Sequence, residues 1–109
     1  MNDLSAKKCA PCEGGVSPLT AAQAAELLAQ LDPQWRIAGD SKSITRAFKF
    51  KDFFRTMSFV NAVAHVANGE DHHPDLQVGY SHCSVTYTTH SIGGLSHNDF
   101  ICAAKIDRL

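Results

Sequence analysis

Three histidines and one carboxylate are the residues of this chain best suited to chemistry. Asp71, His72 and His73 are consecutive, and His90 follows two strand-like runs of sequence further on. An imidazole has an unperturbed pKa of about 6.5, so it both donates and accepts protons near neutral pH. Imidazole and carboxylate groups are also ligands of zinc and iron. The residue types therefore indicate either acid–base catalysis or a metal site.

The spacing of these residues favours acid–base catalysis. Adjacent histidines rarely chelate one ion together because their side chains point apart, and the cluster contains neither an H-x-H nor an H-x-x-x-H spacing. We therefore expect a site without a metal or another cofactor. A zinc or iron protein built on His72, His73, His90 and Asp71 stays open as an alternative.

Composition limits the class of protein. The 109 residues, 44% of them hydrophobic and 19% charged, suit one globular domain. The net charge of -1 gives no electrostatic drive toward nucleic acid or an anionic membrane. No apolar run approaches the roughly 20 residues that span a bilayer, and the N-terminus lacks the apolar core of a secretory signal. We expect a cytoplasmic protein with a flexible tail over residues 1–17 and a single domain over residues 18–109.

The four cysteines are expected to be thiols in a reducing compartment. Cys9 and Cys12 have the C-x-x-C spacing of zinc knuckles and redox motifs. A four-cysteine zinc site needs a second close pair, which Cys83 and Cys102 do not form in the sequence, and no strand precedes the motif as in thioredoxin-like proteins. We interpret Cys9 and Cys12 as an incidental pair in the tail, with metal or redox chemistry as the alternative.

Hydrophobic periodicity predicts seven elements in the order α-β-β-α-β-β-α. They are a helix capped by Thr20, strands at 34–38 and 43–50, a helix from Lys51 to about Ala67, strands at 76–80 and 82–90, and a helix capped by Ser96. This order implies an α+β two-layer sandwich, with a four-stranded antiparallel sheet and three helices on one face. Edge strands of such a sheet are often covered by another subunit, so we expect a homo-oligomer.

The predicted elements place the candidate residues at their ends. Asn68 and Gly69 are a helix stop, so the long helix ends just before Asp71. Pro74 restrains His73 to an extended conformation. The interpretation of the helix stripe that begins at Phe53, Phe54 and Met57 is that it packs in the core.

Several of these segments together resemble the pterin-4a-carbinolamine dehydratase family. The segments that carry the resemblance are 70–75 (EDHHPD), Thr89–His90 and 94–100 (GLSHNDF), with Trp35 and Phe53–Phe54 similar to upstream landmarks. The likeness covers about Leu19 to Asp107. It implies a metal-free dehydratase that converts 4a-hydroxytetrahydrobiopterin, a pterin carbinolamine, to quinonoid dihydropterin and water. This reaction recycles the pterin cofactor of aromatic amino-acid hydroxylases, as in phenylalanine hydroxylation.

The resemblance also implies roles for individual residues. His72, His73 and His90 match the three active-site histidines of the family, Asp71 and Asp99 match acids near that site, and Trp35 matches an aromatic residue in its wall. Asn98 and Asn68 depart from animal members, where we expect an arginine and an acid. The family further implies a homodimer or homotetramer, with a functional link to an aromatic amino-acid hydroxylase. Some animal members also bind a homeodomain transcription factor, a role that these residues do not show.

We expect His72 to be the principal acid–base group. His90 is expected to perform the other proton transfer or to hold the substrate, and His73 to contact the pterin ring. A nearby carboxylate such as Asp71 raises the pKa of a histidine and fixes its tautomer. Simpler interpretations remain open: Asp99 also suits a helix cap, and a tryptophan on a strand, such as Trp35, is more often a core residue. A non-enzymatic dimerisation or binding module, acting through a sheet edge, is a further alternative.

Overall fold

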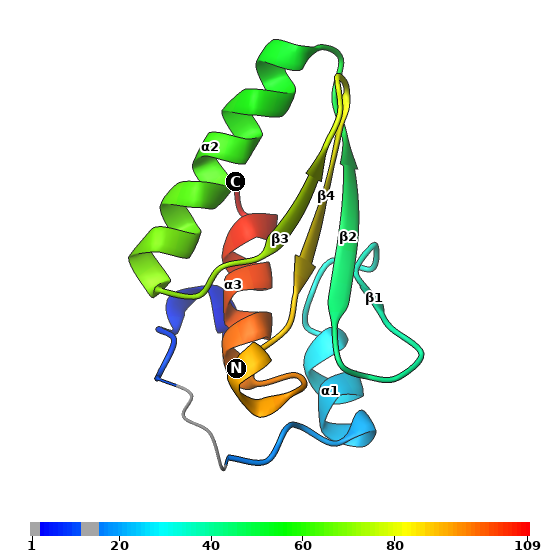
Figure 1. Ribbon diagram of the computed structural model, residues 1–109, viewed down its shortest axis with the longest axis vertical. Coiled ribbons are helices and arrows are strands. Elements are labelled where there is room, and N and C mark those ends of the chain that lie inside the picture. The colour runs from blue at the N-terminus through cyan, green and yellow to red at the C-terminus, as the bar shows by residue number, and fades with distance from the viewer. Residues whose placement is uncertain (1–2, 12–15) are drawn as a thin grey trace.

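The computed structural model describes residues 3–11 and 16–109, which form the predicted α+β fold. Its helices and strands are α1 (Ala21–Leu28), β1 (Arg36–Ile37), β2 (Ile44–Lys49), α2 (Phe53–Glu70), β3 (Asp75–Val78), β4 (His82–Tyr87) and α3 (His97–Asp107), with short 3-10 turns η1 (Leu4–Ala6) and η2 (His90–Ile92). All strand pairs are antiparallel, in the order β1-β2-β4-β3. Helices α2 and α3 lie on one side of the sheet, and α1 packs against α3 at the lower end of the molecule in Figure 1.

Strand β4 is central to the sheet, and its alternating sequence pattern predicts which of its side chains face the helices. It pairs with β2 on one side and with β3 on the other. Cys83, Val85 and Tyr87 are all fully buried toward the helices, as the alternation predicts. They pack in one core with Ile44 from β2 and Phe100 from α3. Burial of each large apolar side chain contributes roughly 1.5–3 kcal/mol to folding.

The cap of α1 is confirmed, whereas some element ends differ from the prediction. Thr20 accepts the Gln23 N–H at 3.2 Å and Gln23 accepts the Thr20 N–H at 2.9 Å, a complete capping box. The predicted last strand is too long, because β4 ends at Tyr87 and His90 begins η2. Helix α2 passes through Gly69 to Glu70.

The assignment of the whole α2 stripe to the core was wrong at its first residues. Phe53 is 49% exposed and Phe54 is 88% exposed, and Phe53 stacks on Tyr80 of the β3–β4 turn with ring centroids 6.2 Å apart. The first turn of α2 lies at the far end of the helix from η1 and α1, where α3 does not reach (Figure 1). Helical spacing alone does not reveal where the opposing layer ends.

A carboxylate at the end of α3 holds the two layers together far from the histidines. Asp107 Oδ1 accepts hydrogen bonds from Trp35 Nε1 and from Arg46 Nη1, each at 2.7 Å. Arg46 also lies over the Phe48 ring, 4.3 Å from its centroid, which explains a cation on the apolar side of β2. Asp107 therefore satisfies two largely buried donors at once.

Replacing Asp107 with alanine is expected to lower the free energy of unfolding by about 2–3 kcal/mol, because Trp35 then keeps a buried donor without an acceptor and Arg46 loses the nearer of its two carboxylates, Asp32 being the other. The midpoint of urea denaturation measures this effect. Asp75→Ala, at an exposed position on β3, is the matched control. Equal midpoints for the two variants would contradict the role of Asp107.

Residues 3–11 lie against α3 (Figure 1), although composition predicts a flexible segment there. Leu4 is 3% exposed, and Lys105 Nζ donates to the Ser5 carbonyl at 2.8 Å. One leucine among polar and small residues is too weak a pattern to predict this packing. Cys12, the second cysteine of the C-x-x-C motif, lies outside the described residues.

Candidate active site

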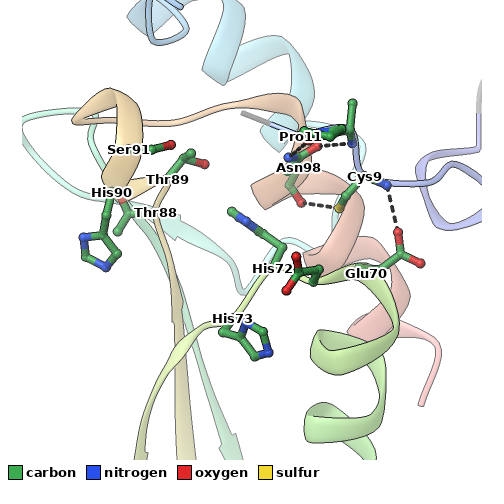
Figure 2. A pocket seen from close by; sticks show the side chains of 12 residues that line it. Cys9, Pro11, Glu70, His72, His73, Thr88, Thr89, His90, Ser91 and Asn98 are labelled. Carbon is green, nitrogen blue, oxygen red and sulfur yellow. Dashed lines mark hydrogen bonds between the residues drawn. The ribbon is translucent and has the colours of Figure 1, made fainter. Parts of the chain in front are cut away.

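A cavity of about 540 Å³ opens where the end of α2, the start of α3, η2 and residues 9–11 meet (Figure 2). Its lining residues are Cys9, Ala10, Pro11, Glu70, Asp71, His72, His73, Thr88, Thr89, His90, Ser91 and Asn98. All three predicted histidines line this one hollow, although His90 is distant from the other two in the sequence. The cavity is large enough for a small heterocyclic ligand.

His72 of the cavity is bonded to a buried carboxylate. Its Nε2 lies 2.6 Å from Asp99 Oδ1, and the Asp99 side chain is fully buried. Asp99 Oδ2 accepts hydrogen bonds from Thr89 Oγ1 at 2.8 Å and from the Ser96 N–H at 2.9 Å. Asp99 is therefore both the third residue of the α3 capping box, where it accepts the N–H of the N-cap Ser96, and the partner of His72.

The pKa of His72 is raised above its ordinary value of 6.5. Burial by itself lowers this pKa, but the hydrogen bond to Asp99 and the Asp99 charge together outweigh that effect. The structure thus stabilises the imidazolium form of His72 relative to that of an exposed histidine. The sequence suggested Asp71 as the carboxylate that raises the pKa of His72. Its charge does raise this pKa, but by less than Asp99 does.

The orientation of His72 follows from the way α2 ends. Asp71 takes the left-handed conformation, with φ 50° and ψ 42°, in place of the glycine expected there. Aspartate tolerates this region better than most residues. The His72 N–H then donates to the Ala67 carbonyl at 3.1 Å. The Tyr87 ring stacks on His72 at 5.4 Å, and its hydroxyl donates to the His72 carbonyl at 3.2 Å.

The other two histidines have more open surroundings. His73 Nε2 lies 3.0 Å from the side-chain oxygen of Asn68, five residues earlier in the last turn of α2, and both residues are exposed. His90 is exposed on η2, across the hollow from His72 and His73 (Figure 2). His72 is thus the one of the three with a carboxylate within hydrogen-bond distance in the described structure.

Trp35 does not lie in the wall of the described cavity, contrary to what the family resemblance implies. It is 3% exposed in the core and donates to Asp107 at the opposite end of α3 from Asp99. The interpretation of Trp35 as a core residue fits its position in this chain.

One wall of the cavity comes from the N-terminal segment, which no sequence pattern placed near the histidines. The Ala10 N–H donates to Asn98 Oδ1 at 3.0 Å, and Asn98 Nδ2 donates back to the Ala10 carbonyl. The Cys9 N–H donates to Glu70 Oε1 at 2.8 Å. These contacts link residues 61 and 88 positions apart, so no local pattern predicts them.

The metal alternative finds little geometric support in the described part of the chain. The Nε2 atoms of His72 and His73 are engaged with Asp99 and Asn68. Across residues 3–11 and 16–109, no three His, Cys, Asp or Glu side chains are grouped so that they could hold a metal ion. Among the same residues, no helix has the length and apolar character to cross a bilayer.

Comparisons with known proteins agree with one another. The family model described as pterin 4 alpha carbinolamine dehydratase matches residues 17–109. A candidate pterin-4-alpha-carbinolamine dehydratase of Nitrosomonas eutropha is 59% identical over 98% of this chain and 93% of its own length. A protein of the same description from Legionella pneumophila strain Corby is 55% identical, over 99% of this chain and 96% of its own.

Solved structures extend the likeness to the fold. A transcriptional coactivator/pterin dehydratase from Brucella melitensis is 36% identical, with a TM-score of 0.79 over 84% of this chain and 97% of its own. A pterin dehydratase-like protein identified as a RuBisCO assembly factor in the alpha-carboxysome is 21% identical, with a TM-score of 0.60 over 69% of this chain and 87% of its own, and shows the fold alone.

Proposed function

The chain belongs to the pterin 4 alpha carbinolamine dehydratase family, and we propose that it dehydrates 4a-hydroxytetrahydropterins, with 4a-hydroxytetrahydrobiopterin as the representative substrate. The products are quinonoid dihydropterin and water. Membership of this family makes the chain a hydro-lyase. The observation that carries the proposal is the His72–Asp99 pair in a cavity that His73 and His90 also line.

The proposed reaction needs two proton transfers and no change in redox state. A proton goes to the leaving hydroxyl at carbon 4a, and another leaves a ring nitrogen as the C–O bond breaks. We assign the first transfer to His72, because the bond to Asp99 raises its pKa and so favours the protonated ring that can act as an acid. Since Nε2 is bonded to Asp99, Nδ1 is the ring nitrogen that remains for the substrate.

The remaining cavity residues have supporting roles in this proposal. His90, across the hollow and exposed, accepts the proton from the ring nitrogen or holds the substrate. His73, fixed by Asn68, contacts the pterin ring. Asp71 shapes the end of α2 that positions both neighbouring histidines. A proton shuttle of this kind uses only side chains of the chain itself.

The test is a rate measurement on 4a-hydroxytetrahydropterin generated in place by an aromatic amino-acid hydroxylase. The absorbance of quinonoid dihydropterin is followed with and without the protein. We expect the protein to accelerate its appearance in proportion to its concentration. A rate equal to the uncatalysed one at every protein concentration would overturn the proposal.

Removal of divalent metals is expected to leave the dehydration rate unchanged. The reason is that Nε2 of His72 and Nε2 of His73 already have partners in Asp99 and Asn68, and the described residues contain no group of three metal-ligating side chains. The measurement compares protein dialysed against EDTA with untreated protein in the same assay. Loss of activity on dialysis, restored by zinc or iron, would favour the metal alternative instead.

We also propose that the protein recycles the pterin cofactor of an aromatic amino-acid hydroxylase, because such an enzyme produces the carbinolamine.

A homodimer or homotetramer is the proposed assembly. Its support is the open sheet, whose outer strands β1 and β3 have one neighbour each among the described residues, and the exposed Phe54 and Tyr80. Sedimentation velocity tests the assembly, and a monomer at micromolar concentration would contradict it.

A further inference from the structure

Two cysteine thiols outside the proposed proton-transfer machinery lie in contact. The Sγ atoms of Cys9 and Cys102 are 3.5 Å apart, although 93 positions separate them in the sequence. Cys102 is fully buried on α3, and Cys9 is partly exposed and lines the cavity (Figure 2). One thiol of the pair is therefore open to a reagent in the cavity, and the other lies directly behind it.

The chain around Cys9 is held in place by contacts on both sides of the thiol. Its own N–H donates to Glu70, and Ala10 next to it exchanges two hydrogen bonds with the Asn98 side chain. The Cys9 sulfur also lies 3.6 Å from the Asn98 carbonyl oxygen, within hydrogen-bond distance for a thiol. Contact between the sulfurs is thus set by several independent interactions.

We propose that Cys9 and Cys102 are a modification site, a thiol pair that a small-molecule disulfide such as oxidised glutathione converts into an intramolecular disulfide. The sulfurs need to approach by about 1.5 Å to reach the bond length of a disulfide. This inference goes beyond the proposed dehydration and does not depend on it. Cys12 takes no part in it.

The exchange proceeds in two steps that balance. Cys9 loses its proton to solvent and its sulfur attacks one sulfur of the oxidised glutathione, which releases one glutathione thiol and leaves a mixed disulfide on Cys9. Cys102 then loses its proton, attacks the Cys9 sulfur and displaces the second glutathione. The two protein thiols give up two electrons, and the glutathione disulfide gains them.

The order of the steps follows from the environment of each thiol. Cys9 faces the cavity, so it meets the reagent first. Cys102 lies directly behind Cys9, with the two sulfurs 3.5 Å apart, which places Cys102 for the second, resolving step. The contact with Cys102 and burial raise the pKa of Cys9, so access from the cavity, and not a low pKa, makes Cys9 the first thiol to react.

The Cys9–Cys102 disulfide would link the N-terminal wall of the cavity covalently to α3. Residues 9–11 line the hollow, and Cys102 Sγ lies 4.0 Å from the carbonyl oxygen of His72. A link between positions 9 and 102 also closes a loop of nearly the whole chain, which restricts the unfolded state strongly. Oxidation is therefore expected to fix the wall and raise the melting temperature.

The test uses the full chain with Cys12→Ser, so that a Cys9–Cys12 bond cannot form. After incubation with oxidised glutathione, the intact mass is expected to fall by about 2 Da, the loss of two hydrogens. A peptide map should join the segment that contains Cys9 to the segment that contains Cys102. The melting temperature should rise by on the order of 10 °C and return with dithiothreitol.

The control is the double variant Cys9→Ser/Cys12→Ser, which keeps Cys102 and Cys83 but is expected to show neither the mass loss nor the rise in melting temperature. The second control, Cys12→Ser/Cys102→Ser, should stop at the glutathione adduct on Cys9. If it fails to fold, the Cys9 control decides alone. Unchanged thiols, a stable adduct in the Cys12→Ser chain, or a disulfide between two chains would overturn the proposal.

Discussion

Replacing His72 with alanine is expected to lower kcat/KM for carbinolamine dehydration by about 10²- to 10⁴-fold, the range of one positioned acid–base group. His72 has a buried carboxylate at 2.6 Å and a raised pKa, whereas His73 is bonded to an amide. The loss should fall mainly on kcat, because the proton is needed in the transition state more than in the bound substrate.

The matched control is His65→Ala, a histidine on an exposed face of α2 outside the cavity. Its kcat/KM should equal that of the unmodified protein. Circular dichroism should show both variants folded, since His72 is at the end of a helix and the core around Val85 and Phe100 does not contain it. Wild-type turnover in His72→Ala, or an equal loss in His65→Ala, would show that His72 is not the principal acid.

Local sequence patterns predicted the helix and sheet layers, because these patterns depend only on residues that are neighbours in the sequence. The Thr20–Gln23 capping box and the alternation of Cys83, Val85 and Tyr87 both appear as expected, since a cap and a pleat are properties of a few consecutive positions. The left-handed residue at the end of α2 was less predictable. The stop signal pointed to glycine at position 69, but Asp71 adopts that conformation.

Contacts between distant segments decide the site, and single-sequence patterns do not encode them. The His72–Asp99 bond joins residues 27 positions apart, and the Cys9–Glu70 bond joins residues 61 apart. Three histidines at one cavity were expected from the family resemblance rather than from spacing. For Trp35, the resemblance implied a place in the wall, whereas its bond to Asp107 keeps it in the core of this chain.

Replacing Asp99 with asparagine is expected to lower kcat/KM by about 10- to 10²-fold at neutral pH while the protein still binds pterin. Asp99 contacts His72 and not the substrate in this proposal, so it is a positioning residue. Asparagine keeps nearly the same volume but removes the charge that raises the pKa of His72. Burial then opposes protonation with only the smaller effects of Cys102 and Asp71 against it, so the pKa of His72 falls relative to the unmodified protein.

The pH dependence distinguishes this electrostatic role from a purely structural one. A histidine whose pKa is raised by folding stabilises the fold below its unfolded pKa, and this stability is lost as pH rises through the folded pKa. The free energy of unfolding of the unmodified protein should therefore contain a contribution that falls as pH rises above about 6.5. In Asp99→Asn, the His72 pKa is lowered, so the corresponding contribution should rise as pH approaches 6.5 from below.

The pH dependence of activity should shift in the same direction as the pKa of His72. If the imidazolium of His72 is the acid, the alkaline limb of the pH–rate profile lies above pH 6.5 in the unmodified protein and moves to lower pH in Asp99→Asn. An NMR titration of the His72 ring gives the same displacement without the assay. Asp75→Asn, on the exposed edge strand, should shift neither curve. Identical profiles for Asp99→Asn and the unmodified protein, with lower activity at every pH, would assign Asp99 a role in capping α3 alone.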